Sequence, residues 1–567
     1  MSVRSSILKK ITESLQNVSN TDIYNISSYL RLEAYKGNGM YSFLLPLRTK
    51  DYDIQSEAQN IMNNDQDNIY DNINIKNNIV SFDISREICI KKVLEDNCLT
   101  VSAPTFTNNK RKNVIVEFSS PNIAKPFHVG HLRSTIIGNY VANISSFADN
   151  NNVKRINYLG DWGTQYGLVQ LGVDLAGINE DEMKKSPIKA LYTAYVTANK
   201  LVKTNPSILE RAREIFNNLE NGITSGEQWE TYKQYTIEEL KQVYNRIGIT
   251  FDEYHWESMY NAKNIKKVIT LMEEMQLLTI DKQGRKIVSL NDGKKKKNLP
   301  VIKSDGSTLY IARDIAAAMD RFEKNTFDCM YYVVDNAQIG HFSNLLEILK
   351  QMEVPWAERL KHIRFGRING MSTRKGNMVF LEDILDTARD IMKQRQLDSP
   401  TTKVSMDLMD NSSDILGISA MIISDLKRSR QRDYTFNWDT AFNLQGETGI
   451  KLQYTHCRLV SLERNCGAIL TSECEPSLLR EEVVDDLVVL IASFEETVLK
   501  SYEEMEPCVL TAYLFKLSNA VNRAFIILKI KDESPDVASQ RLLLFHAAKN
   551  VLAQGMKLLG LLPLEKM

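Results

Sequence analysis

One short segment constrains the fold more than any other part of the chain. The apolar run Asn113–Phe118 predicts a buried strand, which ends at the turn Ser119–Asn122. A helix then begins with His128 and His131, which are three residues apart and therefore share one face. A strand, a loop and a helix N-terminus in this order form the usual anion site of an α/β protein. We therefore expect the two histidines and the intervening Gly130 to bind ATP phosphates.

The length and composition are those of a multidomain globular protein. With 567 residues, 43% of them apolar and 25% charged, the chain has room for about three or four domains. The 70 basic and 71 acidic residues leave a net charge of −1, so an RNA-binding surface must come from local placement of Lys and Arg. Apolar stretches stay below the roughly 18 residues of a transmembrane helix, so we expect no membrane contact. The seven cysteines include no C-x-x-C pair, which argues against zinc and favours reduced thiols.

The order of apolar segments predicts a central α/β domain followed by a helical one. From Asn113 to about Phe365, strand-like segments alternate with helices, which predicts a mostly parallel sheet. A long, largely helical insertion is expected at about 170–305, and helical patterns dominate from about residue 380 onward. Nearer the N-terminus, a strand is predicted at Ile79–Ile84 and a helix at Cys89–Leu94. The candidate strands of the parallel sheet are Val114–Phe118, Arg155–Leu159, Met330–Val334 and His362–Phe365.

A second, basic loop strengthens the nucleotide hypothesis. The segment Gly370–Asn377 (GMSTRKGN) contains two glycines and follows the strand predicted at His362–Phe365. Such a loop can close on a triphosphate, where its N–H groups and cations neutralise charge as pyrophosphate leaves. Taken alone, the loop could equally be a surface turn, and the two histidines could be structural. The basic run Lys294–Lys297 is interpreted as a solvated turn, with RNA contact as the alternative.

Together the two segments resemble the paired HIGH and KMSKS signatures of class I aminoacyl-tRNA synthetases. Further stretches narrow the resemblance to the arginyl-tRNA synthetases, from about residue 80 to Met567, and closest to the animal mitochondrial branch. Motifs shared in the same order over this length are a specific sign of this family. The stretches are Glu117–Asn122 (EFSSPN), His131–Ser134 (HLRS), Asn157–Gly163 (NYLGDWG), Ser304–Gly306 (SDG), Gln453–His456 (QYTH) and Gly555–Gly560 (GMKLLG).

The resemblance implies an α/β fold with a Rossmann-like class I catalytic domain and three accessory regions. The catalytic domain is expected at 113–369, including the insertion at about 170–305. An α+β added domain at 1–112 is implied to bind the outer corner of tRNA. A KMSKS-like loop and stem-contact region is implied at 370–440, and an all-α anticodon-binding helix bundle at 441–567.

The sequence retains the residues through which the family binds arginine. A guanidinium is permanently charged, planar and rich in donors, so a selective site should hold carboxylates in bidentate geometry. By resemblance, Glu117 and Asn122 bind the ammonium and guanidinium groups, and Gln338 is a third contact. Tyr310 and Asp314 share one face of a predicted helix, and the family places both on the guanidinium. The residues alone would fit an ordinary amphipathic helix. A site of this kind rejects lysine and citrulline without an editing domain.

The resemblance also implies an ATP site that needs no covalent enzyme intermediate. His128 and His131 would donate hydrogen bonds to phosphate oxygens with the help of the helix N-terminus. Gly130 would let adenine and ribose approach closely. Met371 and Ser372 of the loop are implied to contact ATP. Mg²⁺ would accompany ATP and be held mainly by phosphates and water, so no protein metal site is expected.

The loop departs from the family pattern in a way that affects catalysis. Its KMSKS positions are occupied by Gly370–Arg374 (GMSTR), so both lysine positions are replaced. Members of the family often compensate with a lysine just before the HIGH motif, and Lys125 occupies that place. We therefore predict that Lys125 neutralises the triphosphate, with Arg374 or Lys375 as weaker candidates.

The C-terminal region implies a tRNA partner. Tyr454 matches an aromatic residue that packs near the anticodon, and Met567 matches a C-terminal methionine that contributes there. Each has a structural alternative, Tyr454 as bundle core and Met567 as a frayed end. Lys451 stands where some relatives have a further aromatic residue. The predicted reaction is ATP-dependent attachment of L-arginine to tRNA(Arg), and arginine activation is expected to need bound tRNA.

Two other functions are compatible with parts of the sequence. A small-molecule nucleotidyltransferase would need neither an arginine pocket nor a C-terminal bundle, and a non-catalytic tRNA-binding paralogue would have lost site residues. The segment Met1–Gln16 is basic and carries a helical apolar stripe, which fits a mitochondrial targeting segment or simply a first helix. The resemblance favours a monomer in the mitochondrial matrix, with the cytoplasm as the alternative.

Overall fold

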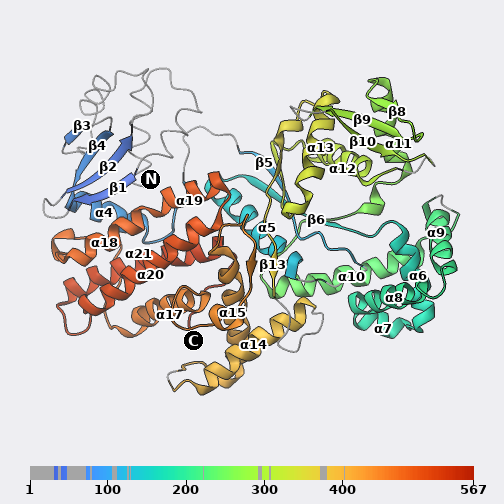
Figure 1. Cartoon of the computed structure of the whole chain (residues 1–567). Helices are drawn as coiled ribbons and strands as arrows, with labels where there is room; N and C mark the ends of the chain where they lie inside the picture. The colour runs from blue at the N-terminus through green and yellow to red at the C-terminus, as the bar shows by residue number, and fades with distance from the viewer. Residues whose placement is uncertain are drawn as a thin grey trace.

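The structure, a computed structural model, consists of a central α/β body, a C-terminal helical body and an N-terminal sheet (Figure 1). It describes residues 31–35, 40–46, 72–76, 79–104, 111–123, 127, 129–220, 223–291, 296–304, 308–370, 380–400 and 402–567. No helix in these ranges is long and apolar enough to cross a membrane.

A parallel sheet forms the centre of the α/β body, as the alternation of strands and helices predicts. It consists of β5 (Asn113–Glu117), β6 (Asn152–Leu159), β7 (Glu253–Trp256), β11 (Cys329–Tyr332) and β12 (Leu360–His362). The order across the sheet is β12-β11-β5-β6-β7. Strand β12 begins and ends earlier than the predicted His362–Phe365. Strand β7 was not recognisable in the sequence because it is four residues long and begins with polar side chains.

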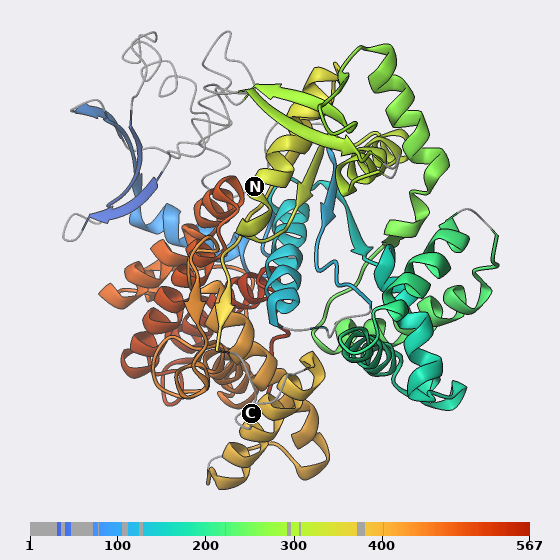
Figure 2. The same ribbon diagram turned by 45° about the vertical axis from the view of Figure 1, so that its right-hand side comes forward.

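Helix α5 (Val129–Ala148) runs between this sheet and the C-terminal helices (Figure 2). Because both of its sides are covered, most of its side chains are buried. Gly138 faces Phe118, the residue that follows β5. A Cβ atom added to Gly138 would lie 2.2 Å from the Cβ of Phe118, so only glycine fits without a shift of the backbone.

We expect Gly138→Ala to destabilise the protein by about 1–3 kcal/mol, because over-packing outweighs the gain in helix propensity. A lowered midpoint of thermal unfolding would show this. Gly340→Ala is the matched control, since Gly340 also lies in a helix, α13 (Ile339–Gln351), and its added Cβ would meet no atom within 4 Å. Equal midpoints for the two variants would contradict the prediction.

The region predicted as a helical insertion is only partly helical. After α10, the chain supplies β7 to the central sheet, forms one further helix, α11, and then builds the antiparallel sheet β10-β9-β8. The polar and basic residues of these strands weaken the apolar pattern that marks a strand. The bounds are α6 (Thr164–Ala176), α7 (Glu180–Lys185), α8 (Pro187–Val202), α9 (Ser207–Glu220), α10 (Glu227–Arg246), η1 (Glu257–Met259), α11 (Ala262–Glu274), β8 (Leu278–Ile280), β9 (Lys286–Asn291), β10 (Lys296–Ile302) and α12 (Tyr310–Asn325).

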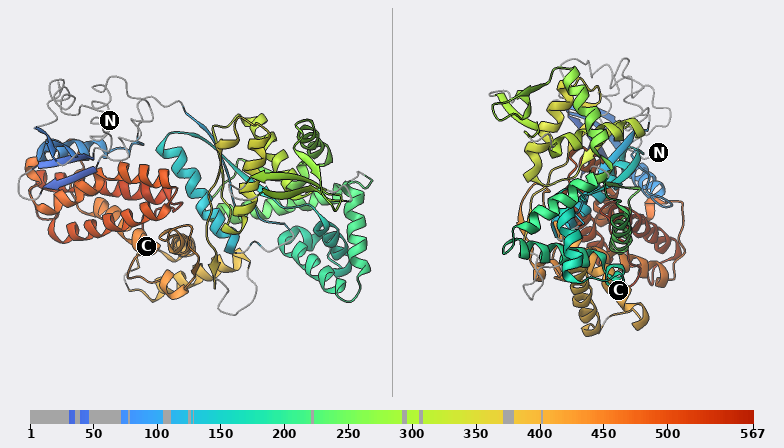
Figure 3. Two further views of the ribbon diagram at one scale, coloured as in Figure 1. Left: turned by 45° about the horizontal axis from the view of Figure 1, so that its top comes forward. Right: turned by 90° about the vertical axis from the view of Figure 1, so that its right-hand side faces the viewer.

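The C-terminal part is a helix bundle, which confirms the prediction for this region. Figure 3 shows the bundle at one end of the molecule and helices α6–α10 at the other. A short parallel pairing of β13 (Ile368–Asn369) with β14 (Tyr434–Thr435) connects the bundle to the α/β body. The other bounds are η2 (Asn336–Gln338), η3 (Ala357–Arg359), α14 (Leu381–Asp398), α15 (Met406–Leu426), α16 (Trp438–Ala441), α17 (Gly449–Asn465), η4 (Pro476–Leu478), α18 (Glu482–Ala492), α19 (Phe494–Glu504), α20 (Pro507–Ile527) and α21 (Pro535–Leu558).

The N-terminal sheet packs on the bundle rather than on the α/β body (Figure 1). Its strands are antiparallel in the order β1-β2-β4-β3, and helix α4 follows β4. Asp485 of α18 accepts hydrogen bonds from Tyr41 of β2 and from Arg86 of α4. The bounds are β1 (Arg31–Tyr35), β2 (Met40–Pro46), β3 (Asn72–Lys76), β4 (Ile79–Ser85) and α4 (Arg86–Asp96), so the strand and the helix predicted here are present.

Candidate active site

A cavity of about 430 Å³ lies at the carboxyl ends of β5 and β11. Its walls come from the turn after β5, the first turns of α5, the segment after β11 and the chain from Phe365 to Asn369. Gly130, His131 and Gln338 all line it, so residues far apart in the sequence meet here as predicted. The carboxyl ends of parallel strands are the usual ligand side of an α/β sheet.

The turn after β5 is strained and is held by side chains from other elements. Ser119 and Ser120 have φ angles of 72° and 46°, in the left-handed region that non-glycine residues rarely adopt. The backbone N–H of Ser119 donates to Ser134 Oγ over 3.0 Å. The N–H of Ser120 donates to Asn157 Oδ1, also over 3.0 Å. These bonds hold the chain at the cavity's edge.

Asn122 follows this turn and is fixed at the neighbouring strand. The backbone N–H of Ile123 donates to Gly160 O, which follows β6, over 3.1 Å. The Asn122 side-chain amide donates to Gln165 Oε1 in α6 over 2.9 Å. Gln165 is therefore a site neighbour that no sequence motif indicated.

Arg133 ties three elements together beside the cavity. Its side chain is 1% exposed, and it forms an ion pair with Asp425 of α15 at 3.1 Å. Its Nη1 donates to the carbonyls of Gly366 and Arg432, on the segments that lead to β13 and β14. Burial raises the pKa of Asp425 to about 6, although the Arg133 charge opposes the rise. Helix α5, helix α15 and the chain leading into the loop at 371–379 are thus held at one buried guanidinium.

The N-terminal parts of α12 and α13 lie near three of the residues predicted to bind arginine. Tyr310 begins α12 with its side chain 66% exposed, and Asp314 is half-buried one turn later. Gln338, at the end of η2, is exposed and precedes α13 directly. The Asp314 carboxylate accepts a hydrogen bond from His341 Nε2, with Oδ2 at 2.7 Å. Because an ionised carboxylate only accepts, the Nε2 atom carries the proton.

Glu117, the last residue of β5, is more deeply buried than is usual for a residue that contacts a substrate directly. Its side chain forms an ion pair with Arg321 of α12, and the two residues are only 4% and 1% exposed. Burial raises the pKa of the Glu117 carboxyl, Arg321 lowers it and the nearby Asp314 raises it further. The Arg321 guanidinium also lies 4.8 Å from the centre of the Tyr158 ring. Arg321, 204 residues away from Glu117, was not identified from the sequence.

Of the residues predicted to contact ATP, only some belong to the described part of the chain. Lys125, His128, Met371 and Ser372 lie outside the described residues. Of the first helical turn, Gly130 and His131 are described, and the His131 ring stacks on Phe127 with the ring centres 5.6 Å apart. The described ranges contain no group of three or more His, Cys, Asp or Glu residues that could hold a metal ion.

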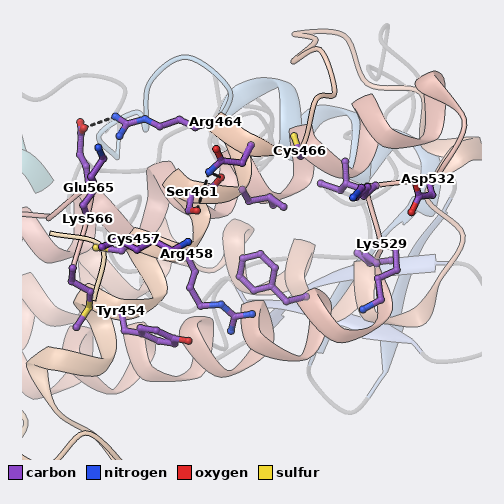
Figure 4. Close-up of a pocket in the computed structure, with 18 residues that line it drawn as sticks. Tyr454, Cys457, Arg458, Ser461, Arg464, Cys466, Lys529, Asp532, Glu565 and Lys566 are labelled. Carbon is purple, nitrogen blue, oxygen red and sulfur yellow. Dashed lines mark hydrogen bonds and ion pairs between the residues drawn. The ribbon is translucent and has the colours of Figure 1, made fainter. Parts of the chain in front are cut away.

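A second, larger groove of about 1130 Å³ lies on the bundle, between α17, the end of α20 and the last residues of the chain (Figure 4). Tyr454 and Met567 both line it, and Tyr454 is 49% exposed, so it is not bundle core. The Arg458 guanidinium lies 4.3 Å from the Phe525 ring centre and 5.6 Å from that of Tyr454. The charged residues of the lining are mostly cationic, with Lys403, Arg458, Arg464, Lys529, Lys531 and Lys566 against Asp532 and Glu565.

Hydrogen bonds fasten the end of the chain beside this groove. The N–H of Leu564 donates to Gln453 Oε1 over 2.8 Å, and the Leu564 carbonyl lies 2.7 Å from His456 Nδ1. The carbonyl of Met567 accepts from the N–H of Lys403 over 3.4 Å. Met567 is therefore not a frayed end. Lys451 donates to Asn519.

Residues 89–438, which include the parallel sheet and the cavity at its carboxyl edge, match the family of class I tRNA synthetases (R), catalytic domain. The chain is therefore a class I aminoacyl-tRNA synthetase. Residues 452–567 match the DALR anticodon binding domain.

The chain is similar over most of its length to arginine–tRNA ligases. A probable mitochondrial arginine–tRNA ligase of Mus musculus is 40% identical, over 86% of this chain and 85% of that protein. A cytoplasmic arginine–tRNA ligase of Saccharomyces cerevisiae is 39% identical, over 81% and 77%. The crystal structure of arginyl-tRNA synthetase from Plasmodium falciparum is 25% identical, with a TM-score of 0.74 over 100% of this chain and 99% of that one. The chain belongs to the arginyl-tRNA synthetases.

Proposed function

We propose that the chain attaches L-arginine to tRNA(Arg) in two steps that consume ATP. Membership of the arginyl-tRNA synthetases carries this proposal. In the first step, the arginine carboxylate attacks the α-phosphorus of ATP in line, which forms arginyl-adenylate and releases pyrophosphate. In the second, a ribose hydroxyl at the 3′ end of tRNA attacks the adenylate carbonyl and releases AMP. Both steps depend on positioning and charge stabilisation rather than on an enzyme nucleophile.

The cavity beside α5 is the proposed ATP site. His131, together with His128, donates hydrogen bonds to phosphate oxygens, and Gly130 leaves room for the adenosine. Lys125 neutralises the triphosphate, and Met371 and Ser372 contact ATP from the loop. Mg²⁺ arrives with ATP and is held by phosphates and water.

The polar groups at the first turns of α12 and α13 form the proposed arginine pocket. Asp314 and Tyr310 bind the guanidinium, and Gln338 and Asn122 bind the amino-acid end. Glu117, fixed by Arg321, adds a second negative charge near Asp314. The carboxylates of Asp314 and Glu117 outnumber the one guanidinium of Arg321, so the pocket carries a net negative charge. The cationic side chain of arginine balances this charge, whereas the neutral side chain of citrulline does not.

The groove on the bundle is the proposed anticodon site. The exposed ring of Tyr454 can stack on an unpaired base, and Met567 supplies an apolar contact. The surrounding lysine and arginine side chains can bind the phosphates of the RNA backbone. The added domain at 1–112 would bind the outer corner of tRNA, and 370–440 would contact the stem. The proposed enzyme is a monomer of the mitochondrial matrix. Imaging a fusion of residues 1–20 tests the location, and gel filtration tests the oligomeric state.

We expect Tyr454→Ala to raise the KM for tRNA about tenfold or more, because stacking on one base contributes about 1–3 kcal/mol. The KM for arginine should not change. Steady-state aminoacylation measures both constants. Tyr454→Phe keeps the ring and is the control, since it should retain nearly normal tRNA affinity. An unchanged tRNA KM in Tyr454→Ala would argue against an anticodon role for the groove.

The overall function is tested with purified protein, ATP, labelled arginine and tRNA, scored for arginyl-tRNA. A nucleotidyltransferase or a non-catalytic paralogue would form none. Pyrophosphate exchange should require added tRNA, and robust exchange without it would refute that part of the proposal.

A further inference from the structure

His341 belongs to none of the motifs that led to the arginine pocket. It lies in the first turn of α13, three residues after Gln338, and its Nε2 atom is 2.7 Å from Asp314 Oδ2. We propose that His341 is a positioning residue for arginine selection, which orients the Asp314 carboxylate to receive the substrate guanidinium. This inference rests on the proposed function, in which Asp314 binds that group.

The location of the pair indicates a role beyond stability. The side chains of His341 and Asp314 are 28% and 26% exposed, whereas those of Arg321 and Glu117 are 1% and 5% exposed. A partly exposed pair of this kind contributes at most about 1 kcal/mol to folding. It joins two different helices, α12 and α13, which lie side by side above the sheet (Figure 1).

The geometry leaves the carboxylate able to bind a second donor group. An ionised carboxylate has about four lone-pair sites, and His341 uses one of them, on Oδ2. The remaining sites can accept guanidinium N–H groups. A carboxylate without a partner would have to lose rotamer freedom on binding arginine, which costs about 0.5–1.5 kcal/mol for an immobilised side chain. His341 removes part of that cost before the substrate arrives.

The imidazole is itself held by aromatic packing. The Phe342 ring meets the His341 ring edge-on at 87°, with the centres 5.5 Å apart. Phe342 packs in turn on Tyr332, the last residue of β11, with ring centres 4.9 Å apart, and on His362 at 4.6 Å. His341 and Phe342 therefore connect the Asp314 carboxylate to Tyr332 of the central sheet.

The test is steady-state aminoacylation with the full-length chain, varying arginine at saturating ATP and tRNA. We expect His341→Ala to raise the KM for arginine about two- to tenfold, with kcat changed less than about twofold. The KM values for ATP and tRNA should not move. His341→Gln keeps a side-chain donor and should recover most of the arginine affinity. In an Asp314→Asn background, His341→Ala should have no further effect, because the carboxylate that it orients is gone.

The controls separate the inference from the proposed function and from loss of stability. His546 forms a comparable pair with Glu463 in the bundle, with Nδ1 and Oε1 2.6 Å apart, so His546→Ala should leave the KM for arginine unchanged. An equal rise in that variant would overturn the inference. If Asp314→Asn raises the KM for arginine but His341→Ala does not, the inference alone fails. If Asp314→Asn has no effect, the proposed arginine pocket fails with it.

Discussion

Replacement of Lys125 by alanine is expected to slow ATP–pyrophosphate exchange, measured with tRNA present, by about two to three orders of magnitude. The reason is electrostatic. The loop at Gly370–Arg374 lacks both lysines of the KMSKS pattern, which favours a cation elsewhere for neutralising the triphosphate as pyrophosphate leaves. Lys125 precedes the helix that carries Gly130 and His131, both of which line the cavity.

Two variants serve as comparisons for Lys125→Ala. Lys375→Ala tests the weaker candidate in the loop and should lose much less activity. Lys263→Ala, on α11, removes a lysine whose exposed position has no part in the proposed site, and should exchange pyrophosphate normally. Near-normal exchange by Lys125→Ala, or a larger loss in Lys375→Ala, would contradict the compensation hypothesis.

Arg321→Met is expected to lower the midpoint of thermal unfolding by about 6–20 °C. Breaking a buried ion pair by removing one partner costs about 3–5 kcal/mol, and each kcal/mol shifts the midpoint by about 2–4 °C in a domain of this size. The loss arises because Glu117 remains buried next to Asp314 without its cation. Arginine activation should fall at the same time, since the pocket is built on this pair.

A double variant separates the structural effect from the chemical one. Glu117→Met combined with Arg321→Met replaces the pair by apolar side chains of similar size, which is often neutral or stabilising. The midpoint should therefore return toward normal while arginine activation stays low. Recovery of activity together with stability would show that Glu117 is dispensable for arginine binding, and an unshifted midpoint in Arg321→Met would contradict the assigned energy of the pair.

The centre of the parallel sheet was predictable because β5 and β11 are buried along most of their length. Segments such as Met330–Val334 are continuously apolar, and they alternate with amphipathic helices. Several strands that escaped prediction carry polar residues, and β7 and β10 also lie at the edges of their sheets. In β7 (Glu253–Trp256) and in β10 (Lys296–Ile302), polar and charged residues weaken the pattern, and only tertiary pairing defines the strand.

Residues proposed to contact the substrates were easier to select from the sequence than the residues that hold them. Asp314 and Gln338 could be assigned by resemblance, and Gly130 and His131 also by local geometry. Arg321 and His341 could not, because each meets its partner only through the fold, across 204 and 27 residues respectively. A spacing rule can detect a shared helix face, but it carries no information on which helices become neighbours.

The attachment of the N-terminal sheet to the bundle affects the order of events during synthesis. Tyr41 of β2 bonds to Asp485, 444 residues later in the chain. At roughly 5–20 residues per second, the ribosome needs about 20 to 90 seconds to supply that partner. During this interval the catalytic domain is being synthesised. The face of the N-terminal sheet that packs on α18 in the folded protein is not yet covered by that helix. The nascent chain must therefore keep strands β1 and β2 from pairing elsewhere until α18 has been made.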